Sequence, residues 1–247
     1  KKIVFMGTPL FAVPILKSLA ESNHNILQVY TQPPRKKNRG LKIIPSPIHE
    51  LSNKISIDVK CPKNLDTVEE VENIKKLKPD VVIVVAYGKI LPKKMLNIKN
   101  IKFINIHASL LPKWRGAAPI QRSLMNLDKS TGVSIMKIVP KLDSGPIMMV
   151  KKIDIVEGSN FLDLSKQLSE LGAKTILECL DLIEKKQDNF IPQNDLEASY
   201  AKKINKVESK INWNKKAKAI IAKINALNPN PGAWFEICLL YTSDAAD

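Results

Sequence analysis

Asn105 and His107 are the residues of this sequence best suited to chemistry at a carbonyl group. They lie two positions apart at the end of a β-rich run, 101–106, and alternate side chains of a strand share one face. An asparagine N–H stabilises a developing oxyanion by roughly 3–4 kcal/mol when it is well aimed. A histidine titrates near neutral pH, so it can donate or accept a proton during a reaction. The pair therefore predicts nucleophilic attack on a carbonyl carbon.

A histidine in this role usually needs an acceptor that orients its ring. The best candidate is Asp143, in a turn at 141–146 that follows a predicted strand, 132–139. A simpler interpretation of the same residues stays open. Asn105 and His107 would then cap the end of a strand, and Asp143 would only nucleate a turn through its side chain.

A longer set of motifs resembles the folate-dependent formyltransferase family. The main motifs are NIHASLLP at 105–112, RGAAPIQ at 115–121 and LDSG at 142–145. Shorter similarities lie at 6–9 (MGTP), 86–92 (AYGKILP) and 228–229 (NP). The resemblance to the family extends over nearly the whole chain, from Lys2 to about Trp234. Within the family the motifs are most similar to those of the members that formylate the methionine on initiator tRNA.

The resemblance implies transfer of a formyl group from 10-formyltetrahydrofolate to the α-amino group of methionyl-tRNA, without a metal. In that reaction the amine attacks the formyl carbon, Asn105 and protonated His107 stabilise the oxyanion, and Asp143 orients the imidazole. The resemblance also implies a folate pocket framed mostly by backbone groups, at Tyr87, Gly88, Ile90, Leu91, Ser109, Leu110, Leu111, Pro112 and Leu142. From the residues alone, Tyr87 is equally consistent with an aromatic at the edge of the core.

A basic segment, 32–42, contains two prolines, one glycine and five basic residues, which predicts an exposed loop. The resemblance implies that this loop contacts the acceptor arm of the tRNA, with Arg39 at the family's Arg-Gly step. Further phosphate contacts are expected from Arg35, Lys36, Lys37 and Lys42. Phosphate contacts position an RNA without reading its sequence. An ordinary solvated run of charges stays the alternative.

The composition favours a polyanionic partner, since the formal net charge is +15, although a lysine-rich solvated surface explains part of that charge. The three cysteines, Cys61, Cys179 and Cys238, lack CxxC spacing, which predicts a reducing compartment and no structural zinc. No apolar run approaches the ~20 residues that cross a bilayer, and no signal peptide is evident. We therefore expect a cytoplasmic monomer without a membrane segment.

The order of predicted strands and helices indicates an α/β fold, with a Rossmann-like, open, mostly parallel sheet and helices on both faces. Strands are expected at 2–6, 25–31, 57–59, 80–86, 101–106, 132–139 and 147–155, with 147–155 antiparallel at the sheet edge. Helices are expected at 9–22, 46–54, 66–77, 119–126, 160–186 and 215–227. The fingerprint GxGxxG is missing, so we exclude NAD as a cofactor.

Four segments are expected along the chain. Residues 1–186 would form the catalytic domain and residues 187–205 a polar linker. The resemblance makes 206–237 the shortened start of a small C-terminal β-barrel domain that helps to hold tRNA. The last residues, 238–247 (CLLYTSDAAD), match no part of the family and resemble translated adapter sequence, so we expect a non-native tail.

Two rival functions stay open. A formyltransferase acting on a small amine, such as glycinamide ribonucleotide or an amino-sugar nucleotide, would share Asn105, His107 and Asp143. Those residues cannot identify the acceptor, whereas the basic segment and the motif at 115–121 favour tRNA. A nonenzymatic RNA-binding protein would explain the charge but not the three candidate catalytic side chains.

Overall fold

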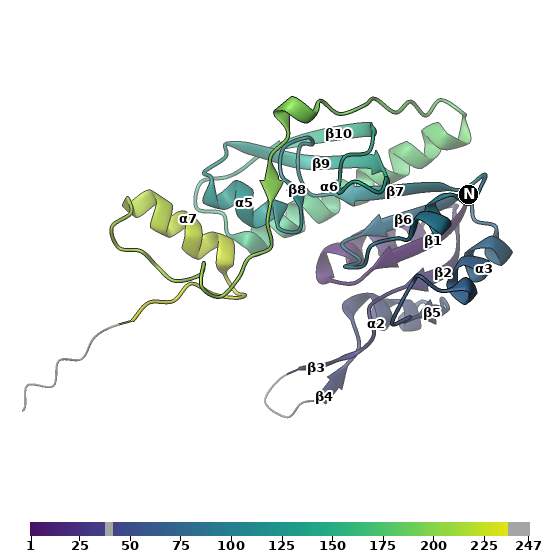
Figure 1. Cartoon of the computed structure of the whole chain (residues 1–247), viewed down its shortest axis with the longest axis horizontal. Coiled ribbons are helices and arrows are strands. Elements are labelled where there is room, and N and C mark those ends of the chain that lie inside the picture. Colours follow the sequence, from purple (N-terminus) through teal and green to yellow (C-terminus); the bar gives the residue numbers. More distant parts are fainter. Residues whose placement is uncertain (38–41, 237–247) are drawn as a thin grey trace, which may run out of the picture.

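One seven-stranded sheet dominates the computed structural model, which describes residues 1–37 and 42–236 (Figure 1). The strand order is β10-β9-β7-β6-β1-β2-β5. The bounds are β1 (Lys2–Gly7), β2 (Asn25–Tyr30), β5 (Val59–Lys60), β6 (Val81–Val85), β7 (Lys102–His107), β9 (Ser130–Lys137) and β10 (Ile147–Asp154). All neighbours are parallel except that β9 runs antiparallel to β7 and to β10. The predicted open, mostly parallel sheet is confirmed.

Helices cover both faces of this sheet. One face packs against η1 (Leu10–Ala12), α1 (Val13–Ala20), α2 (Pro47–Lys54), α5 (Pro119–Met125) and α6 (Phe161–Glu184), and the other against α3 (Val68–Leu77) and α4 (Lys93–Leu96). The central strand β6, with the sequence VVIVV, is buried at every position because both of its faces meet a helical layer. Of the helices in the described residues, none is long and apolar enough to cross a membrane.

The longest helix, α6, begins where its sequence predicts. Asn160 accepts hydrogen bonds from the backbone N–H groups of Leu162 and Asp163, and Asp163 accepts one in return, which forms a capping box. Leucines and isoleucines at helical spacing then form an apolar stripe along α6, which packs into the core between the helix and the sheet.

The basic segment contains a hairpin, so the prediction of a loop without secondary structure is wrong there. Strands β3 (Arg35–Lys37) and β4 (Lys42–Ile44) pair antiparallel and extend away from the sheet (Figure 1). Two antiparallel strands satisfy each other's backbone hydrogen bonds and need no hydrophobic core. The hairpin therefore lacks the apolar pattern from which the other strands were predicted. The predicted tRNA contacts Arg35, Lys36, Lys37 and Lys42 belong to this hairpin, whereas Arg39 lies outside the described residues.

The segment expected as a linker, 187–205, packs back on the sheet domain. It is largely irregular, as expected, but it includes η2 (Asp195–Glu197) and β11 (Tyr200–Ala201). Strand β11 pairs in parallel with β8 (Arg115–Gly116), as Figure 1 shows. After it, α7 (Ala217–Leu227) packs beside α5. The predicted tail, 238–247, lies outside the described residues, and the four predicted segment boundaries stay predictions.

The pairing of β8 with β11 depends on a glycine. Gly116 has φ +119°, and a Cβ atom placed there would lie 2.8 Å from the carbonyl oxygen of Ala201. Any larger residue would therefore combine a strained backbone with a clash against β11.

We expect Gly116→Ala to destabilise the protein more than Gly158→Ala. Gly158 also has positive φ, +84°, but a Cβ atom there would meet nothing within 4 Å. The matched variant therefore suffers only the backbone cost of about 1–2 kcal/mol. Gly116→Ala should lose about 1–3 kcal/mol more through overpacking against Ala201. Thermal unfolding of both variants measures the difference, and equal losses would contradict the close approach of β11.

Candidate active site

The candidate residues Asn105 and His107 lie at the carboxyl end of β7, beside the end of β6. The two strands are parallel, and Val84 pairs with Asn105. Along β7, Ile104 and Ile106 enter the core on one face, whereas Phe103 enters the core on the other. Asn105 and His107 therefore share the Phe103 face, as the alternation predicts. Carboxyl ends of parallel strands are the usual place for ligands in open α/β sheets.

His107 is held by a backbone carbonyl. The residue is 6% exposed, and Nε2 lies 2.8 Å from the carbonyl oxygen of Trp114. A carbonyl oxygen can only accept, so Nε2 carries the hydrogen and donates it. The other ring nitrogen, Nδ1, lies 3.7 Å from Oδ2 of Asp143, which is an ion-pair distance but too long for a hydrogen bond. Trp114 therefore provides the orienting hydrogen bond that we expected from Asp143, and Nδ1 faces the carboxylate.

Asp143 reaches His107 on a loop that doubles back. Strand β9 is antiparallel to β7, so its last residue, Lys137, pairs with Ile104, three residues before His107. The loop that follows must return along β7 to bring Asp143 to the imidazole. Its carboxylate Oδ2 is fixed there by the backbone N–H of Gly116, at 2.8 Å.

The backbone around His107 is strained at three points. Ala86, Trp114 and Asp143 have φ of 45°, 62° and 44°, in the left-handed region that L-residues avoid. Such a conformation costs roughly 1–2 kcal/mol for a residue with a Cβ atom. Strained residues of this kind are often found at functional sites, where contacts with the surrounding structure hold them in place. The strained backbone therefore lies at the same position as the candidate catalytic side chains.

The Asn105 side chain is available for a ligand. It is partly exposed, and within the described part of the chain its carboxamide forms no hydrogen bond. An unpaired N–H beside a fixed imidazole is the arrangement needed to receive a developing negative charge on oxygen.

The residues expected to bind folate divide into buried and exposed groups. Ser109 is fully buried, and its hydroxyl donates to the carbonyl of Lys113 at 2.6 Å. The side chains of Leu91 and Leu111 are buried too, so these residues offer a ligand only their backbone. Leu110 and Pro112 are partly exposed, Gly88 is exposed, and Ile90 and Leu142 are 89% and 60% exposed. The folate contacts themselves stay predictions.

Tyr87 belongs to the core, so its ring is not placed to touch a ligand. The side chain is 1% exposed, and its hydroxyl is buried without a hydrogen-bond partner among the described residues. Burial raises the pKa of Tyr87, and the nearby carboxylate of Glu70 adds to the shift, so the phenol stays neutral. The backbone of Tyr87 is nevertheless fixed at the strand edge, because its carbonyl accepts hydrogen bonds from Thr8 and Gln32.

A cleft of about 520 Å³ opens beside Trp114. It lies between α5 and the chain after β11, and its lining comprises Trp114, Arg122, Met125, Asn126, Tyr200, Lys202, Lys203, Asn205 and Glu208. Arg122 ties the two sides together through the carbonyl of Lys202 and the carboxylate of Glu208. The hydrogen bond from Arg122 to the Glu208 carboxylate lowers the pKa of Glu208. The lining was missed from the sequence because its two halves are some 80 residues apart and lack any shared motif.

No group of three or more His, Cys, Asp or Glu side chains that could hold a metal ion occurs within residues 1–37 and 42–236. The expected absence of a metal stays a prediction.

Comparisons with known proteins agree with the motifs. Residues 1–180 match the family model "Formyl transferase", and residues 203–241 match "Formyl transferase, C-terminal domain". The methionyl-tRNA formyltransferase of Pelagibacter ubique is 55% identical over 236 residues, which are 95% of this chain and 76% of that protein.

Solved structures share the fold at low identity. HypX from Aquifex aeolicus, in complex with tetrahydrofolic acid, has a TM-score of 0.71 at 17% identity, over 95% of this chain and 36% of that chain. A 4-N formyltransferase from Francisella tularensis has a TM-score of 0.72 at 17% identity, over 95% of this chain and 92% of that chain. These structures share the fold, and the family models and the Pelagibacter relative confirm the resemblance inferred from the motifs: the chain belongs to the formyl transferase family.

Proposed function

We propose that this protein transfers the formyl group of 10-formyltetrahydrofolate to the α-amino group of methionyl-tRNA, for the initiation of translation. The observation that carries the proposal is the gathering of Asn105, His107 and Asp143 at one strand end. It occurs in a chain that is 55% identical to a methionyl-tRNA formyltransferase. A nonenzymatic RNA-binding protein has no use for this arrangement.

The residues at the strand edge suit a formyl-bearing folate. The exposed side chains of Ile90 and Leu142 offer apolar surface, and the unpaired carboxamide of Asn105 offers a donor for an oxygen. When bound, the folate supplies the activated one-carbon unit. Asn105 donates its N–H to the oxygen on which negative charge develops, which is worth roughly 3–4 kcal/mol in the transition state.

His107 and Asp143 manage the proton. Because Nε2 is occupied by the Trp114 carbonyl, Nδ1 is the nitrogen that can hold or pass a proton. The carboxylate of Asp143 lies 3.7 Å from Nδ1, which leaves room for a proton to move toward the reacting atoms. Gly116 and Trp114 keep both partners in place.

The basic surfaces suit the acceptor. The cleft beside Trp114 carries exposed Lys202 and Lys203, and the β3–β4 hairpin contributes a second basic element. We assign phosphate contacts of the tRNA to both. A small amine needs neither surface, whereas a polyanionic acceptor gains affinity from each lysine that neutralises a phosphate.

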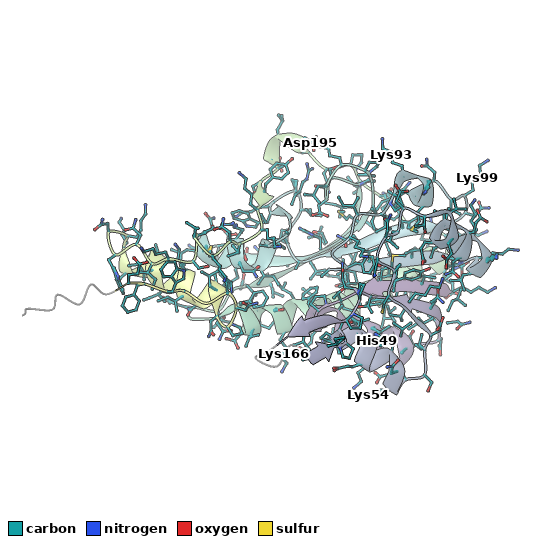
Figure 2. All side chains as sticks on the ribbon, turned by 60° about the horizontal axis from the view of Figure 1, so that its bottom comes forward. His49, Lys54, Lys93, Lys99, Lys166 and Asp195 are labelled. Carbon is teal, nitrogen blue, oxygen red and sulfur yellow. The ribbon has the colours of Figure 1, made fainter. Side chains whose placement is uncertain are left out.

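Reversing the charges of Lys202 and Lys203 together tests the cleft. We expect the double variant to raise KM for methionyl-tRNA while kcat and KM for the folate stay unchanged. The slope of log(1/KM) against log salt should become shallower by about 1.4–1.8, at roughly 0.7–0.9 per phosphate contact. Lys93 and Lys99, labelled in Figure 2 on and after α4, are exposed and supply the matched control. If reversing Lys93 and Lys99 raised KM for methionyl-tRNA equally, the effect would come from the net charge of the protein and not from a binding site in the cleft.

We also propose a monomer that works in the cytoplasm without a metal. The described cysteines, Cys61 and Cys179, are both free, which agrees with a reducing compartment. In addition, one chain contains the cleft beside Trp114, the β3–β4 hairpin and the candidate catalytic side chains, so the proposed reaction needs no second copy.

One assay decides the acceptor. Purified protein is incubated with radiolabelled formyl donor and either methionyl-tRNA, glycinamide ribonucleotide or an amino-sugar nucleotide. Label in acid-precipitable methionyl-tRNA alone is the expected result. Label in a small amine alone would replace the acceptor proposed here, and no transfer to any amine would favour a protein that only binds RNA.

A further inference from the structure

The segment after α6 touches both partners of His107. The amide nitrogen Nε2 of Gln193 donates to the carbonyl oxygens of Asp143, at 2.9 Å, and Gly145, at 2.7 Å. Six residues later, the hydroxyl oxygen of Ser199 accepts the backbone N–H of Trp114 at 2.9 Å. The same short stretch therefore fixes the loop that presents the carboxylate and the residue whose carbonyl orients the imidazole.

Gln193 is itself held firmly. Its Oε1 accepts from Nε and Nη2 of Arg115, at 3.0 and 2.8 Å, and Arg115 is fully buried. Arg115 is fixed in turn by Asp195, whose Oδ1 lies 2.8 Å from Nη1. Figure 2 shows Asp195 on the outer edge of the molecule, and residues 194–197 are all exposed. Directly before this exposed run, Gln193 points inward, toward the site.

The Asp143 loop needs such a support. It doubles back from the far end of β9, it includes a residue with φ 44°, and its carboxylate has no direct hydrogen bond to the imidazole. The distance between Asp143 and His107 is therefore set by the backbone of the loop, together with the Gly116 N–H that binds the carboxylate. Two of the carbonyl groups of that backbone, on either side of Ser144, are bound by one amide group, that of Gln193.

We infer that Gln193 is a positioning residue for formyl transfer, which acts by holding the backbone on both sides of Ser144 so that the Asp143 carboxylate faces Nδ1 of His107. The inference rests on the proposed function of that site. Ser199 supports the same geometry from the Trp114 side. The chain then continues into Lys202 and Lys203, so the segment 193–203 holds both partners of His107 and also lines the cleft assigned to the acceptor.

Gln193→Glu isolates the role. The glutamate keeps an acceptor for Arg115 but loses both donors and sets an oxygen against the carbonyls of Asp143 and Gly145. We expect kcat for methionyl-tRNA to fall about ten- to a hundredfold, as for a small misplacement of a catalytic group, with KM for both substrates unchanged. Glu197→Gln is the matched control, because it removes an exposed charge of the same segment, and among the described residues the Glu197 carboxylate bonds only the side chain of Asn194. It should stay within about twofold of the native protein in kcat.

A double-mutant cycle separates positioning from a structural effect. If Gln193 acts through Asp143, then Gln193→Glu should change kcat by less than about twofold in an Asp143→Asn background. Three results would overturn the inference: a full loss in that background, a kcat near normal in the single variant, or an equal loss in Glu197→Gln. Transfer by the native protein, measured alongside, tests the proposed function independently of these ratios.

Folding is followed by thermal unfolding of each variant. Gln193→Met, which is similar in shape and removes the donors without adding charge, is judged by the same criteria if the glutamate variant unfolds at the assay temperature. Unfolding of both variants would assign Gln193 a structural role and overturn positioning.

Discussion

Replacing His107 by alanine is expected to lower kcat for formyl transfer at least about a hundredfold, the low end of acid–base effects. The variant loses the only group at the strand end that pairs with Asp143 and donates to Trp114 among the described residues. Labelled formyl transfer to methionyl-tRNA measures the loss. His49→Ala, on α2 and labelled in Figure 2, is the matched control and should keep its activity.

The loss must be separated from unfolding, since His107 is 6% exposed and makes a hydrogen bond. Thermal unfolding of the alanine variant should show a folded protein at the assay temperature. A folded variant with near-normal turnover would remove His107 from the mechanism.

Asn105→Ala is expected to lower kcat by about 10²–10³, the usual cost of removing one donor to an oxyanion. Asn105 is partly exposed and its carboxamide has no hydrogen-bond partner in the described part of the chain, so stability should change by less than about 0.5 kcal/mol. Asn105→Asp should be worse, because it sets a carboxylate against the developing negative charge.

The kinetic pattern distinguishes an oxyanion donor from a substrate contact. A donor used only in the transition state lowers kcat and leaves both KM values unchanged. Asn53→Ala, on the exposed side of α2, controls for the loss of a surface amide. A loss confined to KM would move Asn105 from catalysis to binding.

Elements with strong periodicity were predictable from the sequence. The buried run of β6 and the leucine stripe of α6 follow directly from where their apolar side chains must go, and the structure confirms both. The shared face of Asn105 and His107 followed from strand alternation in the same way.

The rest of the site depends on contacts that leave no local pattern. The group that accepts the hydrogen bond of His107 is the backbone carbonyl of Trp114, and every residue type has such a carbonyl, so the sequence cannot identify it. The approach of Asp143 requires knowing that β9 runs antiparallel to β7, which spacing alone does not determine. The polar stretch around Gln193 looks like a linker because its partners, Arg115 and the Asp143 loop, lie at least 48 residues away.

The parallel pairing of β8 with β11 has a consequence for biosynthesis. A nascent chain that has left the ribosome only as far as the end of α6 already contains all seven strands of the sheet. It still lacks Gln193 and Ser199, so neither partner of His107 has its outer support. We therefore expect competence for formyl transfer to arise later in synthesis than the sheet itself, when β11 emerges and docks.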